Sequence, residues 1–425
     1  MLQRLGFPEV GTHRRFVCTL SLDALGTGIW MPLSVLYFLK LTSLSLVDVG
    51  LAMAVASTAV LPAVPWLGAL VDRRGPTWVL QLGNAGAAVT FALYPLGHSL
   101  PAVTTLVFAS SLSNAAFRSA LTPYVAQMTR PGEREVWFGF LQAMRNAGYG
   151  VGGALAAFAA TIGSDAAYQT VVLANAASYV VAFGLMAGGR PTDTPAPARR
   201  FARGPVVAPW LAFRDRAYRT LTMVDLCFAL TQKTFTIAMP IYFVEKLVLP
   251  GWVPGTAFVL NTLMIGLGQG WVIQGVTGLP RRRVMQGAVV LTAASFALFY
   301  LADELSVRAG VVVVLVGVAV YTLGELVAGP VTAALAAEAA PPAQLGQYTA
   351  ASQLTRAVSA ALAPLLFTQL LQQGSWTMWG GGLCLCAVWA GLVSLLATRM
   401  PLANALIKAS TTKPRAETQP EPERG

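Results

Sequence analysis

The feature that most constrains this chain is a series of long apolar stretches with almost no charged residues. An α-helix needs roughly 20 apolar residues to cross the ~30 Å hydrocarbon core of a bilayer. Of the 425 residues, 55% are apolar and only 11% are charged, whereas a soluble domain carries about 25% charged residues. The sequence therefore predicts an all-α integral membrane protein. We expect twelve transmembrane helices, at residues 16–39, 48–71, 77–97, 102–126, 137–162, 167–188, 218–243, 255–278, 284–302, 309–335, 347–372 and 376–398.

Lysine and arginine are unevenly distributed between the segments that connect these spans. Segments on the side of the N-terminus hold 22 of the 29 basic residues, and segments on the other side hold three. Loops rich in Lys and Arg stay in the cytoplasm, so both termini are expected there. This placement also accounts for the net charge of +11 without nucleic-acid binding. The excess of Arg over Lys, 24 to 5, indicates a bacterial gene, and hence a multi-pass protein of the bacterial inner (plasma) membrane.

Matched spacings in the two halves of the chain indicate an internal duplication. Arg118 stands five residues before Pro123, and Glu325 stands five residues before Pro330, with an offset of 207 between the pairs. The segment from Gly188 to Arg219, which lies between the halves, holds five prolines and seven arginines, a composition typical of a linker. Two parallel six-helix repeats predict a cavity between them. The expected parts are an N-terminal bundle at 1–188, a cytoplasmic linker at 189–217, a C-terminal bundle at 218–400 and a disordered cytoplasmic tail at 401–425.

Seven ionisable side chains fall inside the predicted spans. Each costs about 2.5–3.5 kcal/mol at the centre of a membrane helix, so they must face protein, water or each other. Six lie at a similar depth, and one lies nearer the outer side. We expect the two carboxylates at residues 23 and 325 to have arginine partners, although some pairs could be purely structural. The six are Asp23, Arg118, Arg145, Asp225, Glu325 and Arg356, and the seventh is Lys233.

The end of the second predicted span carries a signature. Residues 68–76 read Gly-Ala-Leu-Val-Asp-Arg-Arg-Gly-Pro. This segment resembles the signature of the major facilitator superfamily between helices 2 and 3, roughly Gly-x-Leu-x-Asp-Arg-x-Gly-Arg-Lys, although the closing basic pair is absent. The resemblance covers about residues 14–400 and implies the fold of that family, two pseudo-symmetric bundles of six transmembrane helices. It also implies a gating role for Gly68, Asp72, Arg73 and Gly75.

A second glycine pattern lies in the fifth predicted span. Gly148, Gly152 and Gly153 match the Gly-Pro-x-x-Gly-Gly signature of drug:proton exporters, and Tyr149 replaces the proline. This resemblance implies export coupled to protons. The same glycines would also serve simple close packing between helices, which needs only Gly148 and Gly152 at a spacing of four. Both interpretations stay open at this point.

Together, these features predict a secondary active transporter that moves a small organic molecule by alternating access, with proton-coupled efflux favoured. Asp23 and Glu325 are the expected proton carriers. A role in substrate binding or in a charge network is expected for Arg118, Arg145, Lys233, Arg356, Asp225 and Asn146. The embedded charges suit an anion, a zwitterion or a drug with an acidic group.

Several classes of function are disfavoured by what the sequence lacks. It contains no Gly-x-x-x-x-Gly-Lys-[Ser/Thr] loop for ATP, so the expected energy source is a proton gradient, without a cofactor. It contains two histidines and no His-Glu-x-x-His motif, so neither a metal site nor an embedded enzyme is expected. We expect a monomer in the bilayer. The alternatives that remain are a proton-coupled importer and, less favoured, a non-transporting receptor.

Overall fold

The structure of the protein, a computed structural model, describes residues 8, 10–130, 133–162, 164–187, 211–250 and 252–407. Twelve long helical segments run through these residues, some of them continued by short 3-10 or π-helical turns. The segments are α1 (Arg14–Leu41), α2 with η3 and α3 (Leu46–Val60, Leu61–Ala63, Val64–Arg74), α4 with η4 (Pro76–Leu93, Tyr94–Leu96), α5 (Leu100–Met128), α6 (Arg134–Ile162), α7 (Asp165–Ala187), α9 with η5, α10 and η6 (Arg216–Lys233, Thr234–Ala238, Met239–Ile241, Tyr242–Lys246), α11 (Trp252–Gly275), α12 with η7 (Arg281–Leu301, Ala302–Glu304), α13 (Val307–Ala339), α14 (Leu345–Gln373) and α15 (Ser375–Arg399). Short helices η2 (Gly11–His13), α8 (Leu211–Arg214), η8 (Pro342–Gln344) and η9 (Pro401–Asn404) complete the described part.

Eight of the long segments in the described part are each long and apolar enough to cross a membrane. The prediction of an all-α membrane protein is confirmed, and the twelve predicted spans coincide with the twelve long helical segments. Most of the predicted linker at 189–217 lies outside the described residues, as does the predicted tail from residue 408 onward. The prediction that disorder begins at 401 is wrong for residues 401–407. Gly278 donates its N–H to the Ile407 carbonyl (2.8 Å), and Ile407 donates to Leu279 (3.0 Å), so backbone hydrogen bonds hold this segment against the start of α12.

Local sequence explains where several helices begin and change course. Ser45 accepts a hydrogen bond from the Asp48 N–H, and the Asp48 side chain accepts from the Ser45 N–H, so α2 starts with a capping box. Asp215 caps α9 through its side chain, which accepts from two N–H groups of the first turn. Pro62 and Pro65 cannot donate to a preceding carbonyl, and at this point α2 passes through the 3-10 turn η3 into α3.

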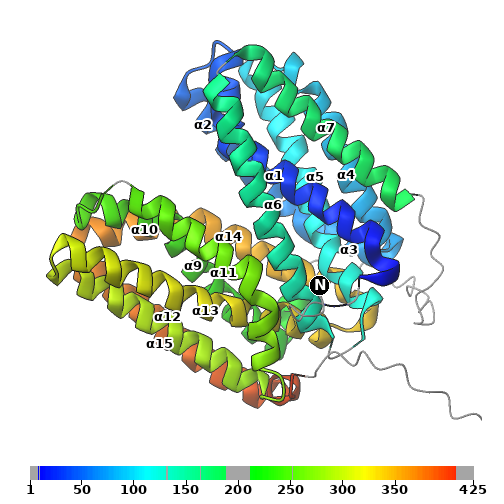
Figure 1. Cartoon of the computed structure of the whole chain (residues 1–425). Coiled ribbons are helices and arrows are strands. Elements are labelled where there is room, and N and C mark those ends of the chain that lie inside the picture. The colour runs from blue at the N-terminus through cyan, green and yellow to red at the C-terminus, as the bar shows by residue number, and fades with distance from the viewer. Residues whose placement is uncertain are drawn as a thin grey trace, which may run out of the picture.

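The helices form two bundles that are tied at one end. α1–α7 pack as one bundle and α9–α15 as the other. The bundles meet at the end where α1 begins and α15 ends, here called the terminal side, and diverge toward the opposite side, where α2 begins and α10 ends (Figure 1). The C-terminal bundle has one large core, and the N-terminal bundle has separate cores toward its two ends.

The interface between the bundles repeats a single motif twice. α3 packs on α14, and α6 packs on α11. In a chain built from two parallel repeats, these two pairings are equivalent, because α3 and α11 belong to the second helix of each half and α6 and α14 are the fifth. The pseudo-symmetry inferred from residue spacing is therefore present in the packing of the helices.

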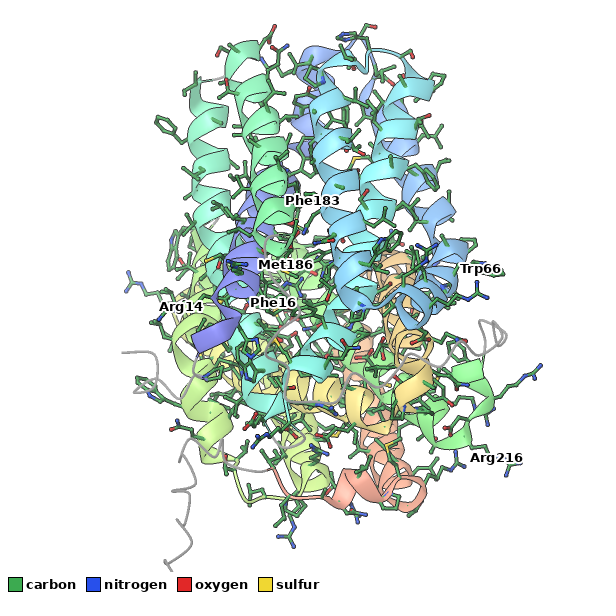
Figure 2. The ribbon with its side chains drawn as sticks, turned by 90° about the vertical axis from the view of Figure 1, so that its right-hand side faces the viewer. Arg14, Phe16, Trp66, Phe183, Met186 and Arg216 are labelled. Carbon is green, nitrogen blue, oxygen red and sulfur yellow. The ribbon has the colours of Figure 1, made fainter. Side chains whose placement is uncertain are left out.

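The outer surface of the bundles suits a lipid environment. Large apolar side chains such as Trp66, Phe158 and Trp376 are 60%, 66% and 69% exposed. Trp66 points outward from α3 (Figure 2). By contrast, Phe16 of α1 and Met186 of α7 lie close together near the terminal side (Figure 2) and belong to one buried cluster. Apolar residues therefore cover both the interior and the exterior, as expected in a bilayer.

Candidate transport site

In the N-terminal bundle, α1, α5, α6 and α7 bring a carboxylate, two arginines and two tyrosines into one network. Tyr179 donates its hydroxyl to Asp23 Oδ1 (3.3 Å). Arg145 Nη2 donates to the Tyr149 hydroxyl (2.8 Å), and Arg118 Nη2 lies 3.4 Å from the same oxygen. Asp23 is within electrostatic range of both arginines, but no ion pair joins it to either of them in the described structure. The direct partner of Asp23 is therefore the tyrosine, and the arginines act on it from a distance.

The carboxylate of the C-terminal bundle lies among amides instead of arginines. Gln232 of α9 and Asn261 of α11 each donate an amide hydrogen to Glu325 of α13 at 3.0 Å. Asn261 also reaches the Thr322 hydroxyl at 3.0 Å. The prediction of an arginine partner for Glu325 is thus wrong, because the helices that face α13 at this level present neutral side chains.

The arginine that was available to Glu325 pairs elsewhere. Arg356 of α14 contacts Asp225 of α9 at 3.4 Å. Asp225 is almost fully buried, and the Arg356 side chain is 41% exposed. Asp225 and Arg356 therefore form an ion pair between α9 and α14. The second oxygen of Asp225 has no hydrogen-bond partner among the described groups. Arg356 therefore contacts only one of the two carboxylate oxygens.

Lys233 belongs to α9 and lies near basic residues of both bundles. It ends α9 immediately before the π-helical turn η5, a local geometry that is frequent at functional sites. Its half-buried ammonium lies within electrostatic range of Arg118 in one bundle and Arg356 in the other. It has no ion pair in the part of the chain that the structure describes. Asn146, by contrast, donates its amide to the Gln142 carbonyl of its own helix (2.9 Å), so the structure does not support its place in the charge network.

The signature at the end of α3 joins the bundles on the terminal side. The Asp72 carboxylate accepts the backbone N–H groups of Gly346 and Gln347 (3.0 Å for Gln347), at the start of α14. A carboxylate is stabilised there by unpaired N–H groups and by the helix dipole. Gly68 allows this approach, since a Cβ in its place would lie 2.6 Å from the Gly346 carbonyl oxygen. Gly75, at φ +87°, forms the turn into α4. Arg73 is exposed.

The glycines of α6 pack against α1, with one exception. A Cβ at Gly148 would lie 2.6 Å from the Ala24 Cβ, and one at Gly152 would lie 2.5 Å from the Leu25 carbonyl oxygen. These two positions therefore permit the close crossing of α1 and α6. A Cβ at Gly153 would have no atom of the described residues within 4 Å. The predicted packing role of Gly153 is wrong, because it lies on another face of the helix.

Sequence reasoning missed an ionic cluster between the bundles on the terminal side. Arg281 of α12 contacts Glu135 of α6 (2.5 Å) and Glu338 of α13 (2.8 Å), and Arg134 lies 4.0 Å from Glu338. Arg281 is 2% exposed and Glu135 is fully buried. These residues flank the predicted spans and were counted with the loops. The signal that could have indicated them is an acidic residue at each of two span ends where basic residues otherwise prevail.

Comparison with known proteins agrees with this architecture. The family model of the Major Facilitator Superfamily matches residues 16–364, and the chain belongs to this superfamily of membrane transporters. It is 31% identical over 166 residues to the class D tetracycline resistance protein of Salmonella ordonez, covering 38% of this chain and 41% of that protein. It is 26% identical over 258 residues to the class B protein of Escherichia coli, covering 58% of each. The chain thus spans about two to three fifths of the length of these curated relatives.

Solved structures share the fold. A bacterial homologue of the iron transporter ferroportin, in an outward-facing state, has a TM-score of 0.76 at 12% identity and covers 91% of this chain and 99% of its own. The human organic anion transporter MFSD10 (TETRAN) has a TM-score of 0.64 at 18% identity with the same coverage. At such low identity these structures establish the fold alone.

Proposed function

We propose that this chain is a secondary active transporter that exports a small organic molecule across the bacterial plasma membrane in exchange for protons. The observation that carries the proposal is the placement of Asp23 and Glu325. Both carboxyl groups lie inside membrane-spanning helices, one in each bundle, and their direct partners are uncharged. Such a carboxyl group can gain a proton without first breaking a direct ion pair, which suits it to carry protons through a membrane.

The charges between the bundles favour a substrate with an acidic group. Arg118, Arg145 and Lys233 have no direct carboxylate partner in the described structure, and Arg356 shares a single pair with Asp225. Cations inside a membrane need counter-charges, and clefts with an excess of one sign of charge attract ligands of the opposite sign. An anionic or zwitterionic molecule would supply the missing counter-charge.

The arrangement of the bundles supports alternating access. With the terminal side in the cytoplasm, as the distribution of basic residues predicts, the bundles are tied at the cytoplasmic side and diverge outward (Figure 1). In this form protons would enter from outside and substrate would leave. Export is then driven by the inward proton gradient, with the protein working as a monomer and without a cofactor.

Reconstituted full-length protein tests the proposal. Tetracycline is the first substrate to assay, because relatives of this chain are named for resistance to it. In proteoliposomes, an acidic interior drives substrate uptake by an antiporter, because protons leave as substrate enters. An acidic exterior drives uptake by a symporter. The proposal expects the first result, and the second would replace it with an importer.

Neutral variants then test the two carboxyl groups. We expect Glu325→Gln and Asp23→Asn to lose gradient-driven accumulation by about 10²-fold or more, the scale of a positioned proton-transfer group. Exchange of labelled for unlabelled substrate without a gradient should persist. Asp165→Asn removes an exposed carboxylate at the start of α7 and serves as the matched control. Accumulation that resists an uncoupler would contradict proton coupling.

A further inference from the structure

A pocket with both polar and apolar walls lies inside the N-terminal bundle, beside Asp23. It has a volume of about 170 Å³ and is lined by residues of α1, α4, α5 and α7. Asp23 lines one wall, and the other polar groups are neutral amides and hydroxyls, chiefly Asn84, Ser110, Asn114 and Asn175. We call this cavity the amide pocket. Neither Arg118 nor Arg145 is among its lining residues, so Asp23 has an uncharged side as well as the side that faces the arginines.

Two buried amides in this pocket have side-chain atoms without a hydrogen-bond partner among the described groups. Asn84 is 0% exposed, and neither its side-chain oxygen nor its nitrogen has a hydrogen-bond partner among the described groups. Asn175 is 2% exposed, and its Nδ2 is also unpartnered among them. A buried polar group without a partner costs about 1–3 kcal/mol. The pocket therefore requires an occupant that can donate and accept hydrogen bonds at the same time.

Water meets this requirement better than an organic ring does. The aromatic side chains of the pocket already pack on one another. Phe91 stacks on Tyr179 with ring centroids 5.7 Å apart, and the Trp30 ring centroid lies 5.2 Å from that of Phe91. A water molecule takes about 30 Å³ of liquid volume and needs two to four polar partners, so the pocket has room for several.

We propose that the amide pocket holds bound water that delivers protons to Asp23 by a route separate from the substrate. The inference rests on the proposed function and adds a path and two positioning residues, Asn84 and Asn175. A hydrated proton is a cation, and it is repelled by the arginines that face Asp23 from α5 and α6. The α4 and α7 walls of the amide pocket offer neutral partners instead, whereas Asn114 on the α5 wall accepts a hydrogen bond from Arg118 Nε at 2.7 Å. An acidic substrate, by contrast, is attracted to the basic residues between the bundles.

The proton step at Asp23 is an exchange between oxygen atoms. An O–H bond of a hydronium ion in the pocket breaks, an O–H bond forms at Asp23 Oδ2, and water remains. Tyr179 continues to donate to Oδ1. The charged and titratable groups around Asp23 are Arg118 on α5, Arg145 and Tyr149 on α6, and Tyr179 on α7. The side toward α4 presents Asn84, which does not titrate.

Infrared spectroscopy of the full-length protein in nanodiscs tests the route without any substrate. The carboxylic acid band of Asp23 is identified by its loss in Asp23→Asn, and its shift after transfer to D₂O measures how fast protons reach the group. We expect Asn84→Leu to slow this shift about tenfold or more. The slowing should not exceed the ~10²–10⁴-fold contribution of a positioned proton-transfer group. Asn84→Ser, which keeps a hydroxyl, should restore the rate.

Matched variants separate the route from general effects on folding. Ser119→Ala removes a buried hydroxyl of α5 that is unpartnered in the described structure and does not line the pocket, and it should leave the rate unchanged. Ala87→Val fills the pocket from another position on α4 and should slow the shift as Asn84→Leu does, which preserves the test if the latter fails to fold. A rate equal to that of the wild type in both pocket variants would overturn the proposal.

A transport assay distinguishes water from substrate as the occupant. Tetracycline exchange in proteoliposomes without a pH gradient should stay within about twofold in Asn84→Leu, because exchange needs no net proton transfer. A raised KM for exchange would overturn the proposal in favour of a substrate pocket. If gradient-driven transport fails but the infrared result holds, the proposed function falls and the water route to Asp23 remains.

Discussion

The ionic cluster on the terminal side predicts that one substitution will change which side of the transporter is open. Arg281→Met removes a guanidinium group that contacts Glu135 at 2.5 and 2.7 Å and Glu338 at 2.8 Å. Glu135 is then left fully buried without its counter-charge. Removal of one partner from a buried ion pair costs about 3–5 kcal/mol. When the terminal side opens, α6 and α12 separate and water reaches Glu135. The substitution therefore destabilises only the state in which the bundles are in contact on the terminal side, here called the tied state.

The size of the expected shift follows from this cost. At 1.4 kcal/mol for each factor of ten, 3–5 kcal/mol corresponds to a change of about 10²- to 4 × 10³-fold in the equilibrium between the two states. The double variant Glu135→Gln with Arg281→Met also removes the buried carboxylate that Arg281→Met leaves without a counter-charge. It should restore most of the tied population, because replacing both partners of a buried pair is often nearly neutral.

Distance measurements between spin labels provide the assay. Leu96, after α4, and Glu304, after α12, are both exposed and lie on the opposite side of the two bundles. Labels at these positions, in a variant that lacks the exposed Cys18 and Cys384, report how far that side is open. Arg281→Met should shorten the dominant distance. An unchanged distribution, or a double variant that shifts as far as the single one, would refute the reasoning.

Three further predictions concern packing, substrate and pH. Gly152→Ala places a methyl group 2.5 Å from the backbone of α1 and should lower stability by about 1–3 kcal/mol, whereas Gly153→Ala, with open space around it, should not. Thermal unfolding of the purified protein compares the pair. Lys233→Gln should weaken binding of a carboxylate-bearing substrate but not of its neutral amide analogue, and Lys233→Arg should retain it. Burial lowers the pKa of His13, which packs edge-on to Trp137. The folded protein then resists a proton that the unfolded chain accepts near pH 6.5, so stability should fall as the pH drops below that value, and His13→Gln should abolish the fall.

The fold could be predicted largely from the sequence because a membrane restricts the choices. Backbone groups in lipid must be satisfied within the helix, so long apolar stretches can be counted as spans with little ambiguity. The spacing from Arg118 to Pro123, repeated at Glu325 and Pro330, correctly indicated two related halves. The hydropathy pattern is less informative, however, about where the ordered structure ends at the C-terminal side of the last span. The segment 401–407 was expected to be disordered and instead forms backbone hydrogen bonds with the start of α12.

The candidate site could be predicted as a set of residues, but their partners could not. Helical depth follows from counting residues, since each adds 1.5 Å along the axis, and it placed Asp23, Glu325 and Arg356 at one level. The direction in which each side chain points depends on how the helices rotate against one another. As a result, Glu325 accepts hydrogen bonds from two side-chain amides, and Arg356 pairs with Asp225.

The sequence by itself determined the membrane class, the twelve spans, the duplication and the charged residues that lipid cannot hold alone, because hydropathy and helix length are properties of a single segment. Only the tertiary structure decided which charges meet, which glycines pack, and that Glu135, Arg281 and Glu338 lock the two bundles together. The contact between Glu135 and Arg281 joins residues 146 positions apart in the chain. Such contacts depend on the packing of whole helices, to which no local pattern in the chain corresponds.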